Sequence, residues 1–118
     1  MTPLTAGAGF APLNIPDWPQ TGDGTPLAAR CLVLDDGHVR LALLSLTVIA
    51  LARREADAIR EAAARAAGVP TSHLMLACTH VHTGPPTHAS DQATRTRMAD
   101  FLALAAVEAA RQAATTQP

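Results

Sequence analysis

Two histidines one residue apart, His80 and His82, are the densest group of chemically active side chains in the sequence. Four apolar residues, 74–77, precede them, and a Gly-Pro-Pro turn at 84–86 follows. If the apolar run is a buried strand, the pair lies at or just past its carboxyl end. Residues i and i+2 of an extended segment point to the same side, with Cα atoms about 6–7 Å apart. Two imidazoles at that spacing can converge on one metal ion or one anionic substrate.

A third ligand for such a site is not evident. Catalytic zinc is generally held by three protein ligands and a water. Asp35, Asp36 and Asp91 are loop acids, and the sequence does not fix their distance from the pair. The other histidines are interpreted as a turn residue, a structural residue at the start of the strand and a solvated loop residue: His38, His73 and His88.

Other catalytic patterns are absent from the sequence. There is no Gly-x-Ser-x-Gly elbow, no phosphate-binding loop and no dinucleotide fingerprint. Cys31 and Cys78 each lie in an apolar run and are predicted to be buried free thiols rather than a disulfide. Cys78 has no neighbour that would activate it as a nucleophile.

Composition indicates one domain with a light core. The chain has 118 residues, and 48% are hydrophobic, but much of this is alanine, with two Phe, one Trp and no Tyr. Such a core is marginal alone or needs a partner surface, so a homo-oligomer is one alternative. The net charge of −1, without a basic cluster, argues against a nucleic-acid partner.

The sequence shows no targeting or membrane-spanning segment. Residues 1–4 have no basic or apolar signal region, and the longest apolar run, 41–52, is too short to cross a bilayer. We expect a soluble, cytoplasmic chain with no transmembrane segment.

The first half of the chain reads as strands. Residues 3–12 predict a short strand, and 12–26 a Pro/Gly-rich loop without regular structure, in which Trp18 is a hydrophobic lid. Apolar runs at 27–34 and 39–50, joined through Asp-Gly, predict an antiparallel hairpin. Both runs are nearly continuous, which predicts burial on both faces.

The second half predicts a helix over 53–67, a parallel strand over 73–79 and a last helix over 91–114. Gly68 is the expected end of the first helix. Its predicted buried stripe is Ala52, Ala56, Ile59, Ala63 and Ala66. Its charged residues are assigned to a solvated face: Arg53, Arg54, Glu55, Asp57, Arg60, Glu61 and Arg65. The core side of the last helix is Met98, Phe101, Leu102, Ala105, Ala109 and Gln112.

The fold class is therefore α/β: a hairpin followed by a βαβ unit, with a mixed sheet packed by two helices. In open α/β sheets, ligands bind beyond the carboxyl ends of the strands. The His80–His82 pair is expected there.

Several segments resemble the neutral/alkaline (non-lysosomal) ceramidases. Thr79-His-Val-His-Thr-Gly-Pro85 is similar to the family's Thr-His-Thr-His-Ser-Gly-Pro signature. Residues 27–37 and 40–46 resemble its hairpin strands, and Gly68-Val-Pro followed by 73–76 leads into the signature as in that family. The likeness covers most of the chain, but only the amino-terminal part of a family catalytic domain.

The resemblance implies a zinc-dependent amidase that cleaves the N-acyl bond of ceramide or of a related N-acyl sphingoid lipid. It implies Zn²⁺ as cofactor, His80 as a metal ligand and His82 as a catalytic residue facing the substrate. Family members are often secreted or membrane-associated.

The sequence departs from the family pattern at several places. Residues 10–13 replace an Asp-Ile-Thr segment, Asp17-Trp-Pro19 stands where Gly-Tyr is expected, and Thr47 replaces an acid after the second strand. The sequence also ends at Pro118, before the family's second zinc histidine and its later Glu and Tyr ligands. We therefore expect residues 1–118 to be a single ceramidase-like N-terminal domain, a fragment or truncated form, with an incomplete site.

Three alternatives remain open. The chain could be a non-catalytic ceramidase-like domain that has lost the metal, or a structural subunit of an oligomer. It could also be a barrel amidohydrolase with a His-x-His motif, although eight βα units need about 250 residues.

Overall fold

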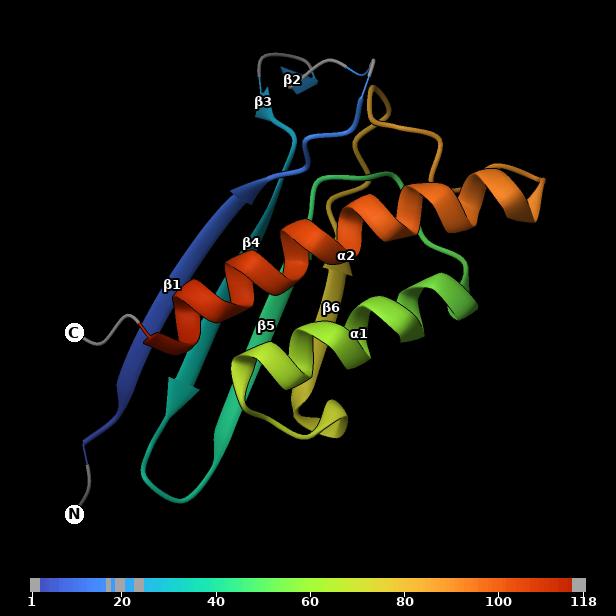
Figure 1. The fold of residues 1–118 in the computed structure, drawn as a ribbon. Coiled ribbons are helices and arrows are strands. Elements are labelled where there is room, and N and C mark those ends of the chain that lie inside the picture. The colour runs from blue at the N-terminus through green and yellow to red at the C-terminus, as the bar shows by residue number, and fades with distance from the viewer. Residues whose placement is uncertain (1–2, 17, 19–20, 23–24, 116–118) are drawn as a thin grey trace.

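A computed structural model describes residues 3–16, 18, 21–22 and 25–115; Met1, Asp17 and Pro19 lie outside this part. Four strands form one mixed sheet in the order β1-β4-β5-β6, and two helices cross it diagonally (Figure 1). The sheet strands are β1 (Thr5–Pro12), β4 (Ala28–Asp35), β5 (Arg40–Leu46) and β6 (Leu74–Cys78). The helices are α1 (Arg53–Ala67), a short 3₁₀ turn η1 (Thr71–His73) and α2 (Gln92–Thr115).

Strands β4 and β5 form the predicted Asp-Gly hairpin. They pair antiparallel, with Cys31 opposite Leu44. In the turn, the Asp35 and Asp36 carboxylates accept backbone N–H groups, from Gly37 at 2.7 Å and from His38 at 2.8 Å. The Gly37 N–H is the main reason that the pKa of Asp35 is lowered, and for Asp36 it is the Val39 N–H, also at 2.8 Å, followed by that of His38. The turn is therefore held by its own side chains.

Strand β5, helix α1 and strand β6 form the predicted βαβ unit, since β5 and β6 pair parallel. Helix α1 ends at Gly68, which has φ 73° and donates its N–H to the carbonyls of the last turn. Strand β1 pairs antiparallel with β4 along its whole length. The expected fold class is confirmed: α/β, a hairpin and a βαβ unit, with a mixed sheet packed by two helices.

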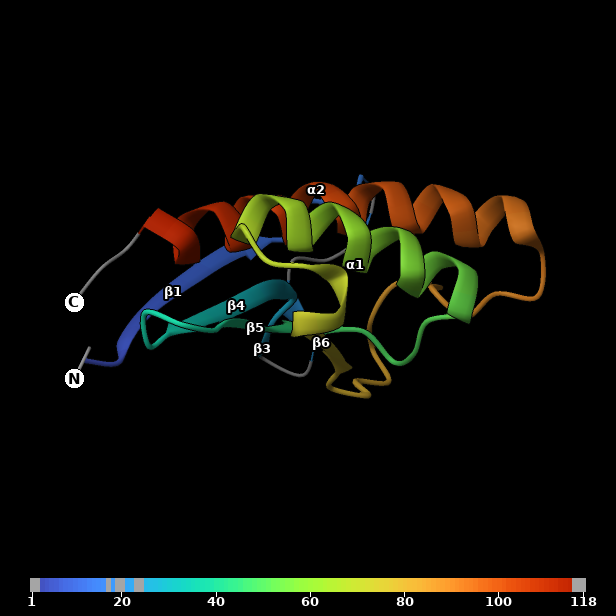
Figure 2. The ribbon, with the colours of Figure 1, turned by 90° about the horizontal axis from the view of Figure 1, so that it is seen from below.

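Both helices lie on one face of the sheet, so the fold has two layers (Figure 2). The core between the helices and the sheet is rich in alanine, so the backbones of the two layers can come close together. A Cβ built on Gly9 of β1 would lie 1.9 Å from the Ala109 carbonyl oxygen of α2. The largest fully buried apolar residues are Leu44, Leu46, Val48, Ile59, Pro85 and Leu102.

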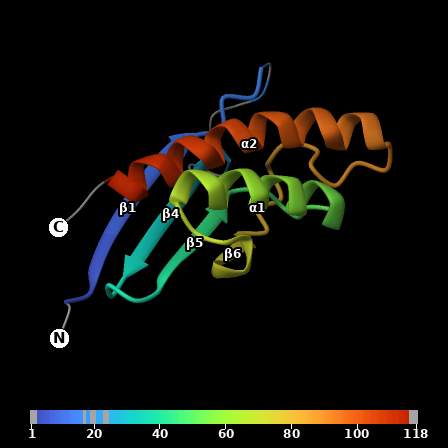
Figure 3. The same ribbon diagram turned by 60° about the horizontal axis from the view of Figure 1, so that its bottom comes forward.

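The expectation that the two hairpin runs are buried on both faces is wrong. Leu32 of β4 and Leu43 of β5 point away from the helices and are 36% and 41% exposed, and Met75 of the neighbouring strand β6 is 65% exposed. Figure 3 shows α1 and α2 side by side over the same face. Because no described element covers the other face, its apolar residues remain open. The second run also leaves the sheet earlier than expected, after Leu46 rather than Ala50.

The buried stripe of α1 is also shifted from the expected one. The buried residues are Glu55, Ile59, Ala63, Ala64 and Ala67. Glu55, assigned to the solvated face from the sequence, is only 4% exposed. It is buried because α2 packs beside it and supplies Arg95 as a partner.

Within the Pro/Gly-rich segment, two short strands pair antiparallel, β2 (Thr21–Gly22) and β3 (Thr25–Pro26), where no regular structure was expected. Trp18 packs against the core cluster, as a hydrophobic lid would. Both cysteines are free thiols, Cys31 buried and Cys78 partly buried. In the described part of the chain, no helix has the length and apolar character needed to cross a membrane.

Candidate functional site

The two histidines lie just past the carboxyl end of β6, beside the end of its parallel neighbour β5. The backbone N–H of Thr79 donates to the Leu46 carbonyl, and that of His80 to the Val48 carbonyl, both at 3.0 Å. The strand itself stops at Cys78, and His80 has φ 68°, in the left-handed region. The segment therefore turns at His80, and the extended i, i+2 geometry expected from the sequence is wrong.

The ring of His80 is held in one orientation. Its Nδ1 lies 2.9 Å from the carbonyl oxygen of Ile49. A carbonyl oxygen only accepts hydrogen bonds, so Nδ1 must be the protonated nitrogen. In the neutral ring, the lone pair is then on Nε2, and the side chain is exposed. A protonated nitrogen bonded to a carbonyl is the arrangement that orients metal-binding histidines.

His82 lies against this ring in spite of the turn. The two ring centroids are 4.9 Å apart with an interplanar angle of 81°, an edge-to-face contact. Both side chains are exposed, so a small ligand can reach both. The structure thus brings together the two histidines that the sequence singled out.

The other histidines are not part of this group. His73 lies at the opposite end of β6, where its Nδ1 is 3.2 Å from the Arg40 carbonyl oxygen. His38 is exposed in the hairpin turn, and His88 is exposed in the loop after the pair. Their positions agree with the structural and solvated roles expected from the sequence.

The loop that follows the pair is fastened to the segment after β5. The hydroxyl of Thr87, which is 1% exposed, donates to the Ala50 carbonyl at 2.6 Å. Pro85 is fully buried. A Cβ built on Gly84 would lie 3.2 Å from Val81 Cγ1 and 3.8 Å from Val48 Cα, so the loop packs closely on the segment after β5. Hydrogen bonds therefore join residues 47–50 to residues 79–87 at both ends. We call these two segments the frame of the site.

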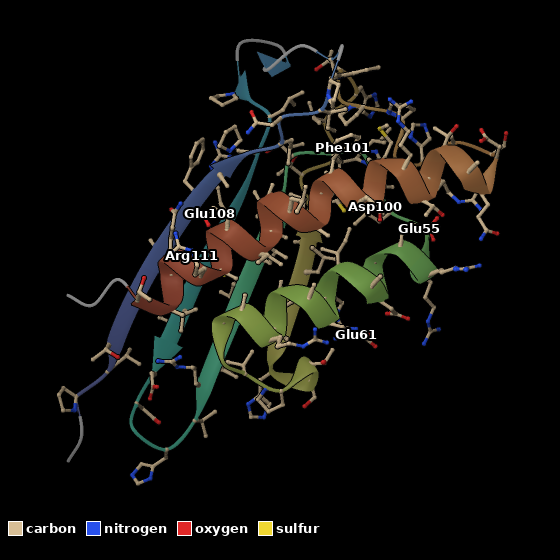
Figure 4. All side chains as sticks on the ribbon, viewed as in Figure 1. Glu55, Glu61, Asp100, Phe101, Glu108 and Arg111 are labelled. Carbon is tan, nitrogen blue, oxygen red and sulfur yellow. The ribbon has the colours of Figure 1, made fainter. Side chains whose placement is uncertain are left out.

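One ion pair beside this frame was missed from the sequence. Arg95 Nε donates to Glu55 Oε1 at 2.8 Å, and Arg95 Nη1 donates to the carbonyls of Ala89 and Ser90 at 2.7 and 2.8 Å. A signal for Glu55 was available: it precedes Ile59, Ala63 and Ala67 at intervals of four, on one helical stripe. Figure 4 labels Glu55 in the first turn of α1.

The residues described do not complete a metal site. Among them, no group of three or more His, Cys, Asp or Glu side chains could hold one ion. Thr47, which replaces the expected acid, is 3% exposed; its hydroxyl donates to the Ala28 carbonyl and accepts from Arg30. It stabilises the end of β5 rather than facing a ligand.

A cysteine nucleophile is disfavoured by the environment of both thiols. Burial raises the pKa of the Cys31 thiol from 9.0 to about 11, and burial also raises the pKa of Cys78. A thiol that holds its proton more tightly than usual is a poor nucleophile near neutral pH.

A large depression lies elsewhere on the surface. It has a volume of about 720 Å³ and lies over the open face of the sheet, lined by Phe10, Leu32, Leu43 and Met75. Arg30 is the charged residue in this lining, and its guanidinium already contacts the Phe10 ring and Thr47. We place the candidate site at the His80–His82 pair, because the Ile49 carbonyl orients the His80 ring and both imidazoles are exposed side by side.

Together, the fold and the site define a two-layer α/β unit with a histidine pair at the carboxyl end of a parallel strand. No protein-family model matches the sequence, and no curated protein matches it closely. Among the solved structures that share the fold are a neutral ceramidase from Pseudomonas aeruginosa (TM-score 0.68, 18% identity) and a ceramidase complexed with C2 (TM-score 0.66, 18% identity).

Each match covers 99% of this chain but 22% of the ceramidase chain. The chain therefore spans about a fifth of the length of the structures it resembles. At this level of identity the likeness establishes a shared fold with one part of these ceramidases.

Proposed function

We propose that this chain supplies part of the active site of a zinc-dependent amide hydrolase resembling neutral ceramidase. In this proposal His80 binds zinc through Nε2, and His82 is the catalytic neighbour that faces the substrate. The substrate class is an N-acyl sphingoid lipid or a related amide. The single observation that best supports the proposal is the hydrogen bond from His80 Nδ1 to the Ile49 carbonyl, which leaves Nε2 free for a ligand.

The side chains fit a zinc site in part. Bound zinc would polarise an amide carbonyl and lower the pKa of a bound water to about 7. His80 would hold the ion, and His82 would hydrogen-bond a polar group of the substrate beside it. Because catalytic zinc is generally held by three protein ligands, the remaining ligands must come from outside the described residues.

Metal binding, rather than turnover, is the decisive measurement for a partial site. Zinc titration by calorimetry should show one site per chain in the wild type. His80→Ala should weaken it at least about tenfold, which is about 1.4 kcal/mol. His88→Ala is the matched control, because His88 is an exposed histidine of the same loop outside the pair. Equal affinity in all three proteins would refute the role of His80.

A non-catalytic ceramidase-like domain is the second candidate. It is favoured by Thr47, which has a hydroxyl bonded within the fold where the resemblance leads us to expect an acid. The same titration separates the two candidates, since a domain that has lost its metal would bind no zinc in the wild type.

A further inference from the structure

We propose that the Glu55–Arg95 ion pair is a positioning device that sets the geometry of the His80–His82 pair. This inference rests on the proposed function for its purpose. Its structural part can be tested without metal.

The ion pair joins the two helices into which the segments of the frame continue. The segment after β5, residues 47–52, continues directly into α1, and Glu55 lies in the first turn of that helix. The segment after β6, residues 79–91, continues into α2, and Arg95 lies in its first turn. A bond between these two turns therefore fixes the far ends of both segments relative to each other.

Arg95 does more than neutralise Glu55. Its Nε contacts the carboxylate, while Nη1 donates to the Ala89 and Ser90 carbonyls at the end of the histidine loop. The guanidinium thus bridges α1 and the end of residues 79–91, the loop that carries His80 and His82, with three hydrogen bonds. A lysine has the same charge but presents a single point donor, and it does not reproduce this fork.

The contacts continue from Arg95 to the imidazole. Residues 89–90 are held by Arg95, Thr87 is bonded to Ala50, and His80 is bonded to Val48 and Ile49. The carbonyl that fixes the His80 tautomer thus belongs to the segment that leads to Glu55. Releasing Arg95 would loosen one end of this frame and allow the Ile49 carbonyl to move from His80 Nδ1.

Because the ion pair is largely buried, losing one partner should destabilise the fold. Glu55 is 4% exposed and the Arg95 side chain 22% exposed. Removing the arginine would leave an unpaired carboxylate in the interior, which is strongly unfavourable. Glu55→Gln is the milder change, because an amide oxygen still accepts from Arg95 Nε.

The test compares Arg95→Lys and Glu55→Gln with Arg40→Lys in the metal-free chain. Arg40 is a matched control: its Nε contacts Asp35 and its Nη1 the Ala67 carbonyl, both at 3.0 Å, at the other end of α1. The readouts are the ¹⁵N shifts of the His80 ring and hydrogen exchange of the His80 amide. Urea unfolding of each variant gives its global stability for comparison.

We expect Arg95→Lys to reduce the Nδ1–H tautomer of His80 and to speed exchange of its amide about tenfold. Arg40→Lys should leave both unchanged, even if it lowers global stability by the same amount. Zinc affinity of Arg95→Lys should fall about tenfold or more, as for other groups that orient a ligand histidine. Unchanged ring shifts and amide exchange in a folded Arg95→Lys protein would overturn the proposal.

If Arg95→Lys does not fold, Glu55→Gln decides the matter: it removes the charge of the ion pair, so the His80 ring shifts and amide exchange should change in the same direction by a smaller amount. Unchanged readouts in the folded Glu55→Gln protein would then overturn the proposal. An altered His80 ring in a chain that binds no zinc would sink the proposed function but uphold the positioning role. Zinc binding with an unaltered ring in both variants would do the reverse.

Discussion

Gly9 allows helix α2 to lie directly on strand β1, because any side chain there would meet the backbone of Ala109. Gly9→Ala should therefore destabilise the fold by about 1–3 kcal/mol, the usual effect of forcing atoms into a packed interior. Urea denaturation measures the change. Ala8→Ser, one residue away on the open face, is the control and should change stability by less than about 0.5 kcal/mol. Equal stability of both variants would contradict the close approach.

The thiol of Cys31 should be nearly inert in the folded chain. Burial raises its pKa from 9.0 to about 11, which lowers the thiolate fraction at pH 8 about a hundredfold. Alkylation by iodoacetamide at pH 8, followed by mass spectrometry, should be slow at Cys31 and rapid in urea. Comparable rates in both states would show that the thiol is accessible.

The same thiol makes stability depend on alkaline pH. Above about pH 9 the unfolded chain loses this proton, while the folded chain keeps it until about pH 11. Its contribution to stability is therefore complete below pH 9 and lost as the pH rises to about 11. Cys31→Ala should show a smaller fall in stability across this range in urea melts.

At the residue scale, the sequence predicted which histidines come together but not how. The apolar run and the Gly-Pro-Pro turn placed His80 and His82 at a strand end. The orientation of the His80 ring depends on the Ile49 carbonyl, which is 31 residues away in the chain. No local pattern encodes such a contact. The pairing of Glu55 with Arg95 was hidden for the same reason, since Arg95 is 40 residues away.

Helix α1 depends on a left-handed residue at its end. Gly68 has φ 73°, and a Cβ there would also lie 3.1 Å from Arg40 Nη1. Gly68→Ala should cost about 1 kcal/mol, and Gly68→Asn less, because asparagine tolerates this conformation better. Thermal or urea unfolding of the two variants checks the order. A more stable alanine variant would contradict the geometry at this helix end.

Elements with strong local signals were predictable to within a few residues. The helix over 53–67 matches α1, and the Asp-Gly hairpin and the parallel strand are present. The prediction that was wrong concerned the burial of the strand faces. A continuous apolar run on β4 and β5 does not say whether one or both faces are covered. That depends on which side the two helices take, a property of the whole chain.

The open face of the sheet is the main exposed apolar surface of the molecule as described. It includes Phe10, Leu32, Leu43 and Met75, each at least 36% exposed. Exposed apolar surface of this kind binds hydrophobic dyes. The folded chain should therefore enhance ANS fluorescence at neutral pH, and Leu43→Lys should reduce the enhancement at least twofold with little loss of stability.

The control for that measurement is Leu104→Lys. Leu104 is 72% exposed, but it lies on α2 rather than on the open face. Its replacement should leave the ANS signal unchanged. An equal decrease in both variants would show that the dye does not bind the sheet.

The alanine-rich layer between the helices and the sheet also has a thermodynamic consequence. Alanine has no rotamers to lose, so its burial requires no side-chain ordering. The alanines of α2 that are at most 7% exposed are Ala99, Ala105, Ala106, Ala109, Ala110 and Ala113. This core buries little area per residue, but it also loses little entropy on folding. Where β1 meets α2, the spacing of the two layers is set by backbone contact at Gly9 and Ala109 rather than by interlocking side chains.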